Sequence, residues 1–434
     1  MESTQSLRRH PPTRPPEQAL SSTDTEGPIL SRPTWEPGRS PAGRYYRRVR
    51  AEKESSAEPC AGLRVLLVIK CLGYGGAERL LVDMVSAPDR RFEYEVAYVL
   101  RDQDALVPAV RESGTPVHAL GATHNGDLRW MTALRRVLVE GRYDVVHFHL
   151  PYAAALGQLV VTSLPRSIRP GVVYTEHSLW DRTPLVIRAL LRTTVRHGER
   201  LVAVSQASYD ALPTPLRRRA KVVVHGVDLS RSDSLMARRR DLQVSVRAEL
   251  GIDPGEFLFM AVANLRPEKG YRVLLDAART IADRGLPIRI AAVGRGPLRD
   301  ELAERHAELA LGDRFLFLGQ RDDVLQLLAG ADAFVLASLH EGLPVALMEA
   351  TSVGLPIVAS SVGGIPQILE TETDALLVPP GNPNALVEAM TRLAADPELQ
   401  ERLGRQAKLH SSMFDIAEAG RSVGDVYLQV ARPQ

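Results

Sequence analysis

The sequence predicts an α/β fold in two domains with parallel sheets, and three features point to it. Short apolar runs rich in Val, Leu and Ile alternate with helix-length segments from Leu63 onward, as in βαβ units. The chain has 434 residues, which is enough for two well-buried cores. The polar, basic segment RSDSLMARRR at 231–240 is typical of a linker between them.

The first sixty residues differ from the rest of the chain. They are rich in Pro, Arg, Ser and Thr without strand or helix periodicity, so residues 1–60 are expected to be disordered. They hold 10 of the 54 basic and 8 of the 52 acidic residues, leaving 44 of each sign, so charge gives no reason to expect nucleic acid as a partner. Cys60 and Cys71 fit neither a disulfide scaffold nor a metal site. Without a signal-peptide or membrane-span pattern, we expect a cytoplasmic protein.

The first domain is expected to begin with the strand RVLLVIK, whose density of branched residues suits burial on both faces. Gly73, Gly75 and Gly76 then turn the chain into a helix. Their spacing is not G-x-G-x-x-G, so we expect no dinucleotide site, and a plain tight turn is the alternative. Five further strands are expected, at 94–100, 116–120, 144–148, 171–175 and 201–204.

Several polar residues near strand ends raise the question of a metal. Asp102 and Asp104 form a D-x-D, but they follow an early strand, where Asp commonly caps a helix. His147 and His149 share one face of a strand, yet no nearby Cys, Asp or Glu completes a ligand set. We therefore expect no metal and no other cofactor. His177 ends another strand; it is either a site residue or a structural histidine bonded to backbone.

The second domain is expected to open with a strand at 257–263, followed by a basic turn and a helix that begins near Lys269. Arg266 and Lys269 would lie at a strand end beside a helix N-terminus. There a planar guanidinium, a mobile ammonium and the helix dipole would together attract phosphate. The plain alternative is a surface Arg and Lys.

The stretch 334–364 reads as strand, loop, helix, strand and Gly-Gly turn, one compact parallel unit. Ligands bind beyond the carboxyl ends of such strands, where Glu341 is expected, while Glu349 falls in the second turn of the helix. Each carboxylate can accept hydrogen bonds from two hydroxyls, as on a sugar. Gly363 and Gly364 would offer backbone N–H groups to phosphate at the next helix start. The pattern fits a nucleotide-sugar site, and the plain alternative is two solvated helix glutamates.

The run SLHEGLPVALMEATSVGLPIVASSVGGIP closely resembles the donor-binding segment of the retaining glycosyltransferases of family four. Glu341 and Glu349 match the family's E-x7-E pair, and Gly363 and Gly364 match its Gly-Gly. That family has the GT-B fold, two Rossmann-like domains facing across a cleft. The resemblance covers roughly residues 63 to 430 and is stronger in the second domain.

The resemblance implies roles for residues outside this run. Gly75 and Gly76 match a glycine loop that faces the donor phosphates and the acceptor, and His177 in VVYTEHS matches a histidine beside the donor sugar. In NLRPEKG, Lys269 matches a residue that neutralises the leaving diphosphate, and Arg266 is inferred to replace the family arginine. The residues expected near the nucleobase are Gly294, Gly296, Gly319 and Arg321.

Three positions depart from the family pattern. His225 stands for Asn, Asn264 for Arg, and Gln367 for Glu. These departures keep open a non-catalytic nucleotide-sugar binding or scaffold protein. An epimerase or phosphorylase on the same fold is the other alternative, and the absent phosphorylase lysine motif speaks against it.

The family resemblance implies an acceptor domain at 61–228, completed by a helix at 415–431, and a donor domain at 241–414. Its implied activity is retaining, metal-independent transfer from a nucleotide sugar to a hydroxyl of a glycan, lipid-linked or small-molecule acceptor. His177, Arg266, Lys269 and Glu341 are the expected catalytic residues.

A peripheral contact with the inner membrane surface is a further expectation, weighed against an ordinary solvated face. The residues that suggest it are Arg188, Arg192 and Arg196 on one predicted helix, and Arg129, Trp130 and Arg135 on another.

Overall fold

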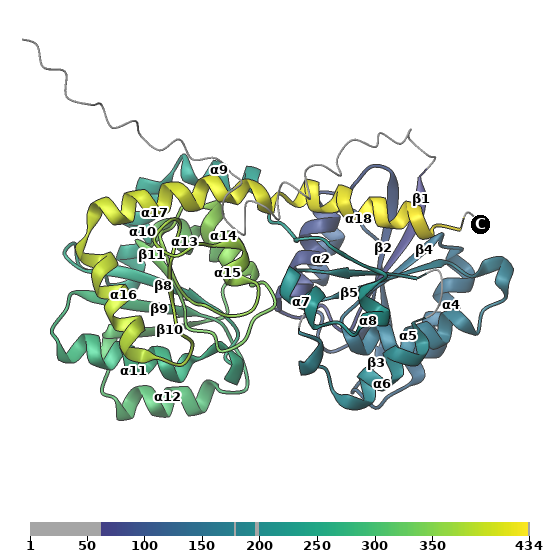
Figure 1. Ribbon diagram of the computed structural model, residues 1–434, viewed down its shortest axis with the longest axis horizontal. Coiled ribbons are helices and arrows are strands. Elements are labelled where there is room, and N and C mark those ends of the chain that lie inside the picture. The colour runs from purple at the N-terminus through teal and green to yellow at the C-terminus, as the bar shows by residue number, and fades with distance from the viewer. Residues whose placement is uncertain (1–61, 178, 196–198, 433–434) are drawn as a thin grey trace, which may run out of the picture.

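The computed structural model describes residues 62–177, 179–195 and 199–432; the predictions for residues 1–60, Cys60 and Arg196 fall outside these ranges. The described chain forms two α/β domains that lie side by side (Figure 1). Each has a parallel sheet with helices on both faces. The α/β prediction with two domains is confirmed.

The first sheet has seven parallel strands in the order β3-β2-β1-β4-β5-β6-β7. The short β7 was not predicted, because AKV is too brief and too polar to stand out from a loop. The strands are β1 (Leu63–Ile69), β2 (Phe92–Leu100), β3 (Val117–Ala122), β4 (Val145–His149), β5 (Gly171–Glu176), β6 (Arg200–Ala203) and β7 (Ala220–Val222).

Alternation along β1 gives each face of this sheet its own core. Leu66 and Val68 pack on one side with Trp130, while Val65 and Leu67 pack on the other with Tyr427. The helices of this domain are α2 (Gly76–Ser86), α3 (Val107–Glu112), α4 (Arg129–Gly141), α5 (Pro151–Thr162), α6 (Leu185–Thr194), α7 (Gln206–Ala211) and α8 (Thr214–Arg217), with the short 3-10 turns η1 (Arg166–Ile168) and η2 (Trp180–Arg182).

The second sheet has six parallel strands in the order β10-β9-β8-β11-β12-β13. They are β8 (Phe257–Val262), β9 (Ile288–Val293), β10 (Phe315–Gly319), β11 (Ala333–Leu336), β12 (Ile357–Ser360) and β13 (Leu376–Val378). The helices that cover this sheet are α11 (Tyr271–Asp283), α12 (Arg299–Glu308), α13 (Val324–Gly330), α14 (Val345–Ser352), α15 (Ile365–Ile368), α16 (Pro383–Ala395) and α17 (Pro397–His410), with the 3-10 turns η3 (Pro267–Lys269), η4 (Gly312–Arg314) and η5 (Ser411–Phe414).

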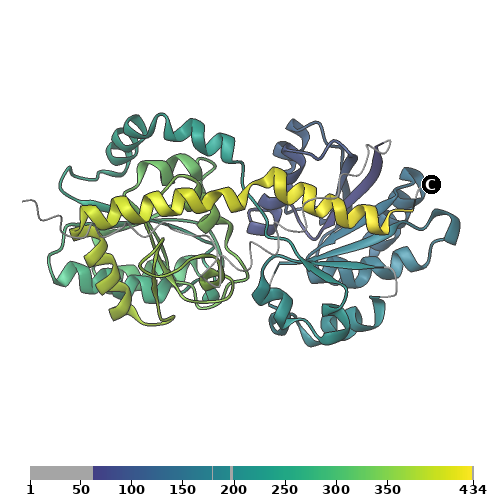
Figure 2. The same ribbon diagram turned by 45° about the horizontal axis from the view of Figure 1, so that its top comes forward.

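The last helix, α18 (Ile416–Val430), returns to the first domain. Figure 2 shows α17 and α18 following one another across both domains. Val423 and Tyr427 of α18 are buried in the same core as Val65 and Leu67 of β1, so the final helix packs on the first domain.

Two local predictions were wrong. The segment predicted as a linker forms helices α9 (Leu229–Met236) and α10 (Arg239–Leu250), because Asp228 accepts hydrogen bonds from two backbone N–H groups at the start of α9 and Val246 of α10 is buried in the second domain. The Asp102–Asp104 pair caps no helix: α3 begins after Leu106 without a side-chain cap, and Asp102 pairs with the neighbouring Arg101 on an exposed turn.

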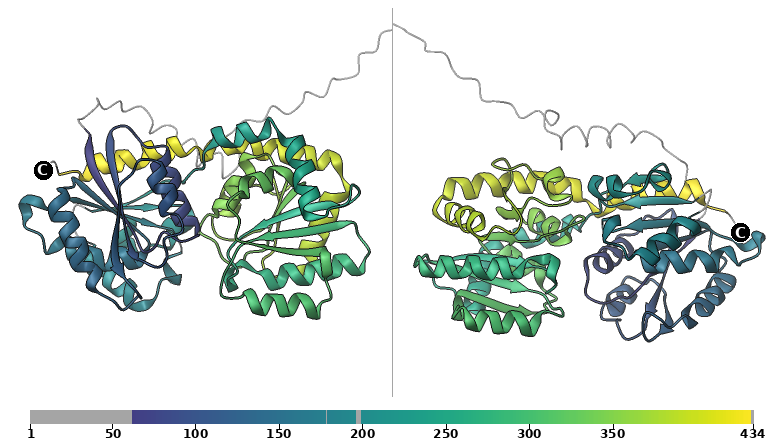
Figure 3. Two further views of the ribbon diagram at one scale, coloured as in Figure 1. Left: turned by 180° about the vertical axis from the view of Figure 1, so that it is seen from behind. Right: turned by 60° about the horizontal axis from the view of Figure 1, so that its bottom comes forward.

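The order of the strands in each sheet indicates where a ligand site lies. Each order reverses beside its first strand, between β1 and β4 and between β8 and β11, and ligands bind at such switch points beyond the carboxyl ends of the strands. Both switch points open toward the junction of the domains, which Figure 3 shows from behind and from below. Among the described residues, no helix is both long and apolar enough to cross a bilayer.

Candidate functional site

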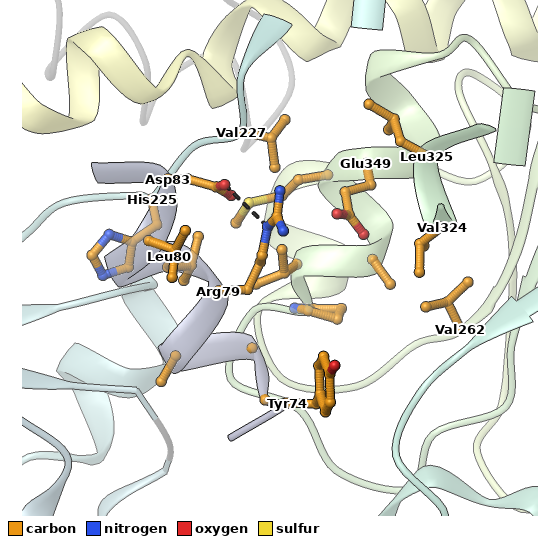
Figure 4. Close-up of a pocket in the computed structure, with 18 of the residues that line it drawn as sticks. Tyr74, Arg79, Leu80, Asp83, His225, Val227, Val262, Val324, Leu325 and Glu349 are labelled. Carbon is orange, nitrogen blue, oxygen red and sulfur yellow. Dashed lines mark ion pairs between the residues drawn. The ribbon is translucent and has the colours of Figure 1, made fainter. Parts of the chain in front are cut away.

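A cavity of about 800 Å³ lies between the two domains. Figure 4 shows side chains from both domains pointing into it. The predicted site residues that line it are Gly75, Gly76 and His177 from the first domain, and Lys269, Gly294, Arg321, Glu341 and Glu349 from the second.

Lys269 and Glu341 form an ion pair in this cavity. Lys269 ends η3 after β8, and Glu341 lies in the loop after β11, so neighbouring strands bring the two together. The Lys269 ammonium donates to both Glu341 carboxylate oxygens, at 2.7 and 2.8 Å, and the Ser338 hydroxyl donates to Oε1 at 2.7 Å. Gly270 permits this turn: its φ is +65°, and a Cβ there would lie 2.0 Å from the Ala337 carbonyl oxygen.

Glu349 projects from α14 without a partner. Among the described residues, none donates a hydrogen bond to its carboxylate. Burial raises its pKa from 4.5 to about 7, and the nearby Asp83 adds to the rise. Across the cavity, Arg79 lies 3.1 Å from Asp83 on α2, and Figure 4 shows this pair facing Glu349. Arg79 and Arg231 lower the Glu349 pKa less than burial raises it.

Arg79 and Asp83 were not predicted as site residues. The sequence signal for them is their spacing of four on the helix that follows the glycine turn, which is equally common in ordinary surface ion pairs.

His177 lies at the end of β5, where the two domains come close. A Cβ on Gly342, next to Glu341, would be only 2.6 Å from the His177 carbonyl oxygen. The His177 ring is 3.1 Å from His149 through Nε2 and stacks on His225 at 5.3 Å. The structure therefore brings His177 and the Glu341 loop to one place.

The Gly-Gly turn, Gly363 and Gly364, packs against the backbone of the Glu341 loop. Gly363 has a φ of +57°, and a Cβ there would lie 1.8 Å from the Glu341 carbonyl oxygen. The Gly364 N–H, expected to be available to phosphate, is donated to the Gly342 carbonyl at 2.9 Å, and the following helix α15 has four residues. These glycines hold the Glu341 loop in place rather than line the cavity.

The other predicted residues lie farther from the cavity centre. Arg266, Gly296 and Gly319 are not among the residues that line it, and Arg266 is exposed. Arg321 lines the cavity, but its guanidinium pairs with Asp323 at 2.6 Å and with Glu249 at 2.5 Å. The structure does not bring Arg266 and Lys269 together as a clamp.

The three departures from the family pattern all lie between the domains or beside the cavity. The Asn264 amide is 3.5 Å from the Tyr74 carbonyl oxygen, and the Gln367 side chain accepts from the Ala207 N–H at 3.1 Å. His225 lines the cavity beside His177.

Within residues 62–177, 179–195 and 199–432, no group of three or more His, Cys, Asp or Glu is arranged to hold a metal ion. His147, which resembled a metal ligand in sequence, bonds instead to the hydroxyls of Tyr427 at 2.7 Å and Thr175 at 2.6 Å.

Family models match both domains. The model described as "Glycosyltransferase Family 4" matches residues 74–231, and "Glycosyl transferases group 1" matches residues 244–410. Together they span the two sheets and the cavity.

Relatives and solved structures agree with this assignment. The chain is 26% identical to the Escherichia coli UDP-Gal:alpha-D-GlcNAc-diphosphoundecaprenol alpha-1,3-galactosyltransferase, over 75% of this chain and 86% of the relative. It is 27% identical to the D-inositol 3-phosphate glycosyltransferase of Streptomyces bingchenggensis, over 67% and 68%. In fold it is similar to Anabaena HepE, solved with UDP and glucose, with a TM-score of 0.70 at 22% identity over 84% and 98% of the two chains.

The lipopolysaccharide glycosyltransferase WaaG has the same architecture, with a TM-score of 0.64 at 16% identity over 84% of this chain and 99% of WaaG. Matching models in both halves, named glycosyltransferases among the relatives and GT-B structures as neighbours all lead to one assignment. The chain belongs to the family-four glycosyltransferases, enzymes of the GT-B fold that use nucleotide-sugar donors.

Proposed function

We propose that this enzyme transfers a sugar with retention of configuration and without a metal, from a nucleotide sugar to a hydroxyl of a glycan, lipid-linked or small-molecule acceptor. The observation that carries the proposal is the cavity between the domains. It holds a cation paired with one carboxylate, Lys269 with Glu341, and a second carboxylate, Glu349, without a hydrogen-bond donor among the described residues.

In this proposal Glu349 accepts hydrogen bonds from the ribose hydroxyls of the donor. An ionised carboxylate can accept several hydrogen bonds, whereas burial raises the pKa of Glu349 and no described residue donates to it. Ribose hydroxyls would supply these hydrogen bonds.

Lys269 and Glu341 act at the reacting end of the donor. Breaking the bond between the anomeric carbon and the diphosphate oxygen places negative charge on the diphosphate, which the Lys269 ammonium stabilises. Glu341 lies beside it and faces the donor sugar. Arg266 does not line the cavity; its charge acts on Glu78 of α2, whose pKa it lowers against a larger rise from burial, so we do not assign Arg266 to the diphosphate.

Retention is inferred from the match to family four and needs no protein nucleophile. The Glu341 carboxylate already accepts from Lys269 and Ser338, so it is poorly suited to attack the sugar. The acceptor hydroxyl would instead attack from the side that the diphosphate leaves. The new bond forms between the acceptor oxygen and the anomeric carbon, and the acceptor proton passes to the leaving diphosphate oxygen.

The relatives support more than one acceptor class. One is named for a diphosphoundecaprenol-linked sugar and another for inositol 3-phosphate. We propose the donor as a nucleoside-diphosphate sugar and test its base directly.

A panel of uridine, guanosine and adenosine diphosphate sugars, screened by thermal stabilisation and then by nucleotide release, identifies the donor. With the donor in hand, the anomeric configuration of the product is read by NMR, and turnover is measured with and without a chelator. An inverted product contradicts retention, and loss of turnover with the chelator that added metal restores contradicts metal independence.

We also propose that α6 meets an anionic lipid surface. Its side chains Leu185 and Val186 are 74% and 77% exposed, and the exposed Arg192 lies on the same helix. Trp130, the aromatic residue expected to take part, is fully buried in the first core and plays no role.

Vesicle flotation with and without anionic lipid tests this contact. Leu185→Ser with Val186→Ser should abolish flotation on anionic vesicles, whereas Val244→Ser, at a residue 71% exposed on the second domain, should not. Equal flotation of all three proteins, or no flotation of the unmodified chain at low salt, contradicts the proposal.

A further inference from the structure

Four histidines lie in a row between the core of the first domain and the cavity. The ring centroids of His147 and His149 are 4.1 Å apart, those of His149 and His177 are 5.4 Å apart, and those of His177 and His225 are 5.3 Å apart. Of these four, His177 and His225 line the cavity. The row begins at Tyr427 of α18, whose hydroxyl bonds to His147.

Burial lowers the pKa of all four histidines, for His225 to about 4. They are therefore neutral near pH 7. A neutral imidazole carries one N–H and one acceptor nitrogen, so the arrangement of hydrogen bonds determines which nitrogen of each ring holds the proton.

The contact between His149 and His177 determines the proton position. His149 Nδ1 lies 3.1 Å from His177 Nε2, so one of the two nitrogens donates and the other accepts. His149 Nε2 is buried and has no partner among the described residues. If His177 donated, the proton of His149 would lie on this nitrogen as a buried N–H without an acceptor.

A buried N–H without an acceptor is rare and costly in folded proteins. If His149 donates from Nδ1 instead, its Nε2 carries only an unused lone pair. The second arrangement costs less. His177 Nε2 then accepts, and the single proton of His177 lies on Nδ1.

His147 cannot change this outcome. Both of its ring nitrogens already bond, to the Tyr427 hydroxyl at 2.7 Å and to the Thr175 hydroxyl at 2.6 Å, so none is left for His149. On the cavity side, His225 lies parallel to His177, with 6° between the ring planes. The His147 and His225 rings thus flank the His149–His177 pair and restrict how its two rings can turn.

We propose that His149 is a positioning residue that holds His177 in the tautomer with its proton on Nδ1, so that His177 offers a hydrogen-bond donor to a hydroxyl oxygen of the sugar in the cleft. His177 lines the cavity, and no described residue bonds to its Nδ1. This inference rests on the proposed function, because it takes His177 to touch the sugar. In this tautomer His177 can donate from Nδ1 but cannot accept a proton there.

NMR of the unmodified chain, labelled with ¹⁵N in its histidines, tests the tautomer without relying on activity. Two-bond and three-bond correlations between ring carbon-bound protons and ring nitrogens distinguish Nδ1–H from Nε2–H, and the spectrum of His177→Asn identifies the His177 signals. We expect the Nδ1–H pattern for His177. An Nε2–H pattern overturns the proposal.

A matched pair of variants tests the positioning role. His149→Asn keeps an N–H near the place of Nδ1, whereas His149→Leu has a similar size and no donor. We expect His149→Asn to stay within about threefold of the original kcat and His149→Leu to lose about tenfold in kcat at unchanged donor KM. Equal kcat for the two variants overturns the proposal.

His177→Ala separates this inference from the proposed function. If His177→Ala keeps full turnover, His177 does not touch the sugar, and both the proposed role of His177 and the positioning role of His149 fall. If His177→Ala loses turnover while the two His149 variants behave alike, only the inference about His149 falls.

Discussion

The ammonium of Lys269 lies 2.7 and 2.8 Å from the two carboxylate oxygens of Glu341, so the cation proposed to bind the diphosphate and the carboxylate proposed to face the sugar are each other's partner. Both side chains are largely withdrawn from water. A donor diphosphate must therefore share Lys269 with Glu341, and each side chain holds the other in place until the donor arrives.

The first prediction concerns this pair. Lys269→Ala should lower both kcat and the free energy of unfolding, because it leaves the Glu341 carboxylate buried with only the Ser338 hydroxyl, a loss on the order of 3 kcal/mol. Chemical denaturation measures it. Lys269→Ala with Glu341→Gln should cost less stability than the two single changes added together.

Arg272 and Glu301 form the matched control for that prediction. Their 2.7 Å pair is exposed on the second domain, so Arg272→Ala should change the free energy of unfolding by less than about 1 kcal/mol. If Lys269→Ala is no more destabilising than Arg272→Ala, the Lys269–Glu341 pair contributes nothing to the preparation of the site.

The second prediction is a pH dependence of donor binding. Glu349 binds ribose hydroxyls best when ionised, and its pKa is about 7. Donor affinity should therefore rise as pH increases through 7, by about tenfold for each pH unit below that pKa. His225, with a pKa of about 4, stays neutral in this range. Calorimetry from pH 5.5 to 8 measures the dependence, which Glu349→Gln should remove; a pH-independent affinity in the unmodified chain contradicts it.

The free energy of unfolding should change with pH in the opposite direction to donor affinity. The folded pKa of Glu349 lies above its ordinary value of 4.5, so ionisation costs the folded state more than the unfolded one. The free energy of unfolding should fall as pH rises from 4.5 to about 7 and then level off. In Glu349→Gln this part of the fall should disappear.

The third prediction separates the two carboxylates by kinetics. Glu349→Ala should raise donor KM, since a ribose contact stabilises ground and transition states alike, whereas Glu341→Ala should lower mainly kcat, because charge develops at the sugar. A lost hydrogen bond to a charged group corresponds to about 10- to 150-fold. Steady-state kinetics with the identified donor measures both. Near-normal kcat/KM in both variants means that the pair does not form the donor site.

The sequence predicted most of the fold because both sheets are parallel and buried. Runs such as RVLLVIK are apolar on both faces and stand out from the helices between them. It did not predict α9, because a polar, basic stretch matches a linker in composition and only the cap at Asp228 signals a helix. The edge strand β7 is too short for periodicity.

Part of the site was predictable because its residues belong to local motifs. Glu341, Glu349 and Lys269 come from motifs whose spacing is set within one strand–loop–helix unit, so their positions could be read locally. Arg79 faces Glu349 from the other domain, and the approach of two domains leaves no local pattern. The orientation of Arg266, exposed rather than turned inward, likewise depends on packing and not on spacing.

The fourth prediction concerns the segment before β1. The first described strand begins at Leu63, and among the described residues the cavity lining begins at Tyr74, so deletion of residues 1–60 should leave donor kcat/KM within about tenfold of the full chain. Turnover of the shortened, monodisperse protein measures this. A larger loss in a protein with an unchanged melting temperature contradicts the prediction.

The last prediction tests whether the Gly-Gly turn serves the Glu341 loop. Gly363 and Gly381 both have positive φ, +57° and +70°, so alanine strains the backbone at either position. At Gly381 the added Cβ would meet only the Leu339 side chain at 3.8 Å, whereas at Gly363 it would lie 1.8 Å from the Glu341 carbonyl oxygen. Gly381→Ala should therefore cost stability alone, about 1 kcal/mol, with kcat unchanged.

Gly363→Ala should cost more stability and should also lower kcat, because the Glu341 backbone must move to admit the methyl group and the carboxylate then leaves the Lys269 ammonium. Denaturation curves and steady-state kinetics on the two variants measure both effects. If Gly363→Ala matches Gly381→Ala in kcat, the turn does not position Glu341. Phosphate contact through the Gly363 N–H would then be the remaining role for this turn, since the Gly364 N–H is already bonded to Gly342.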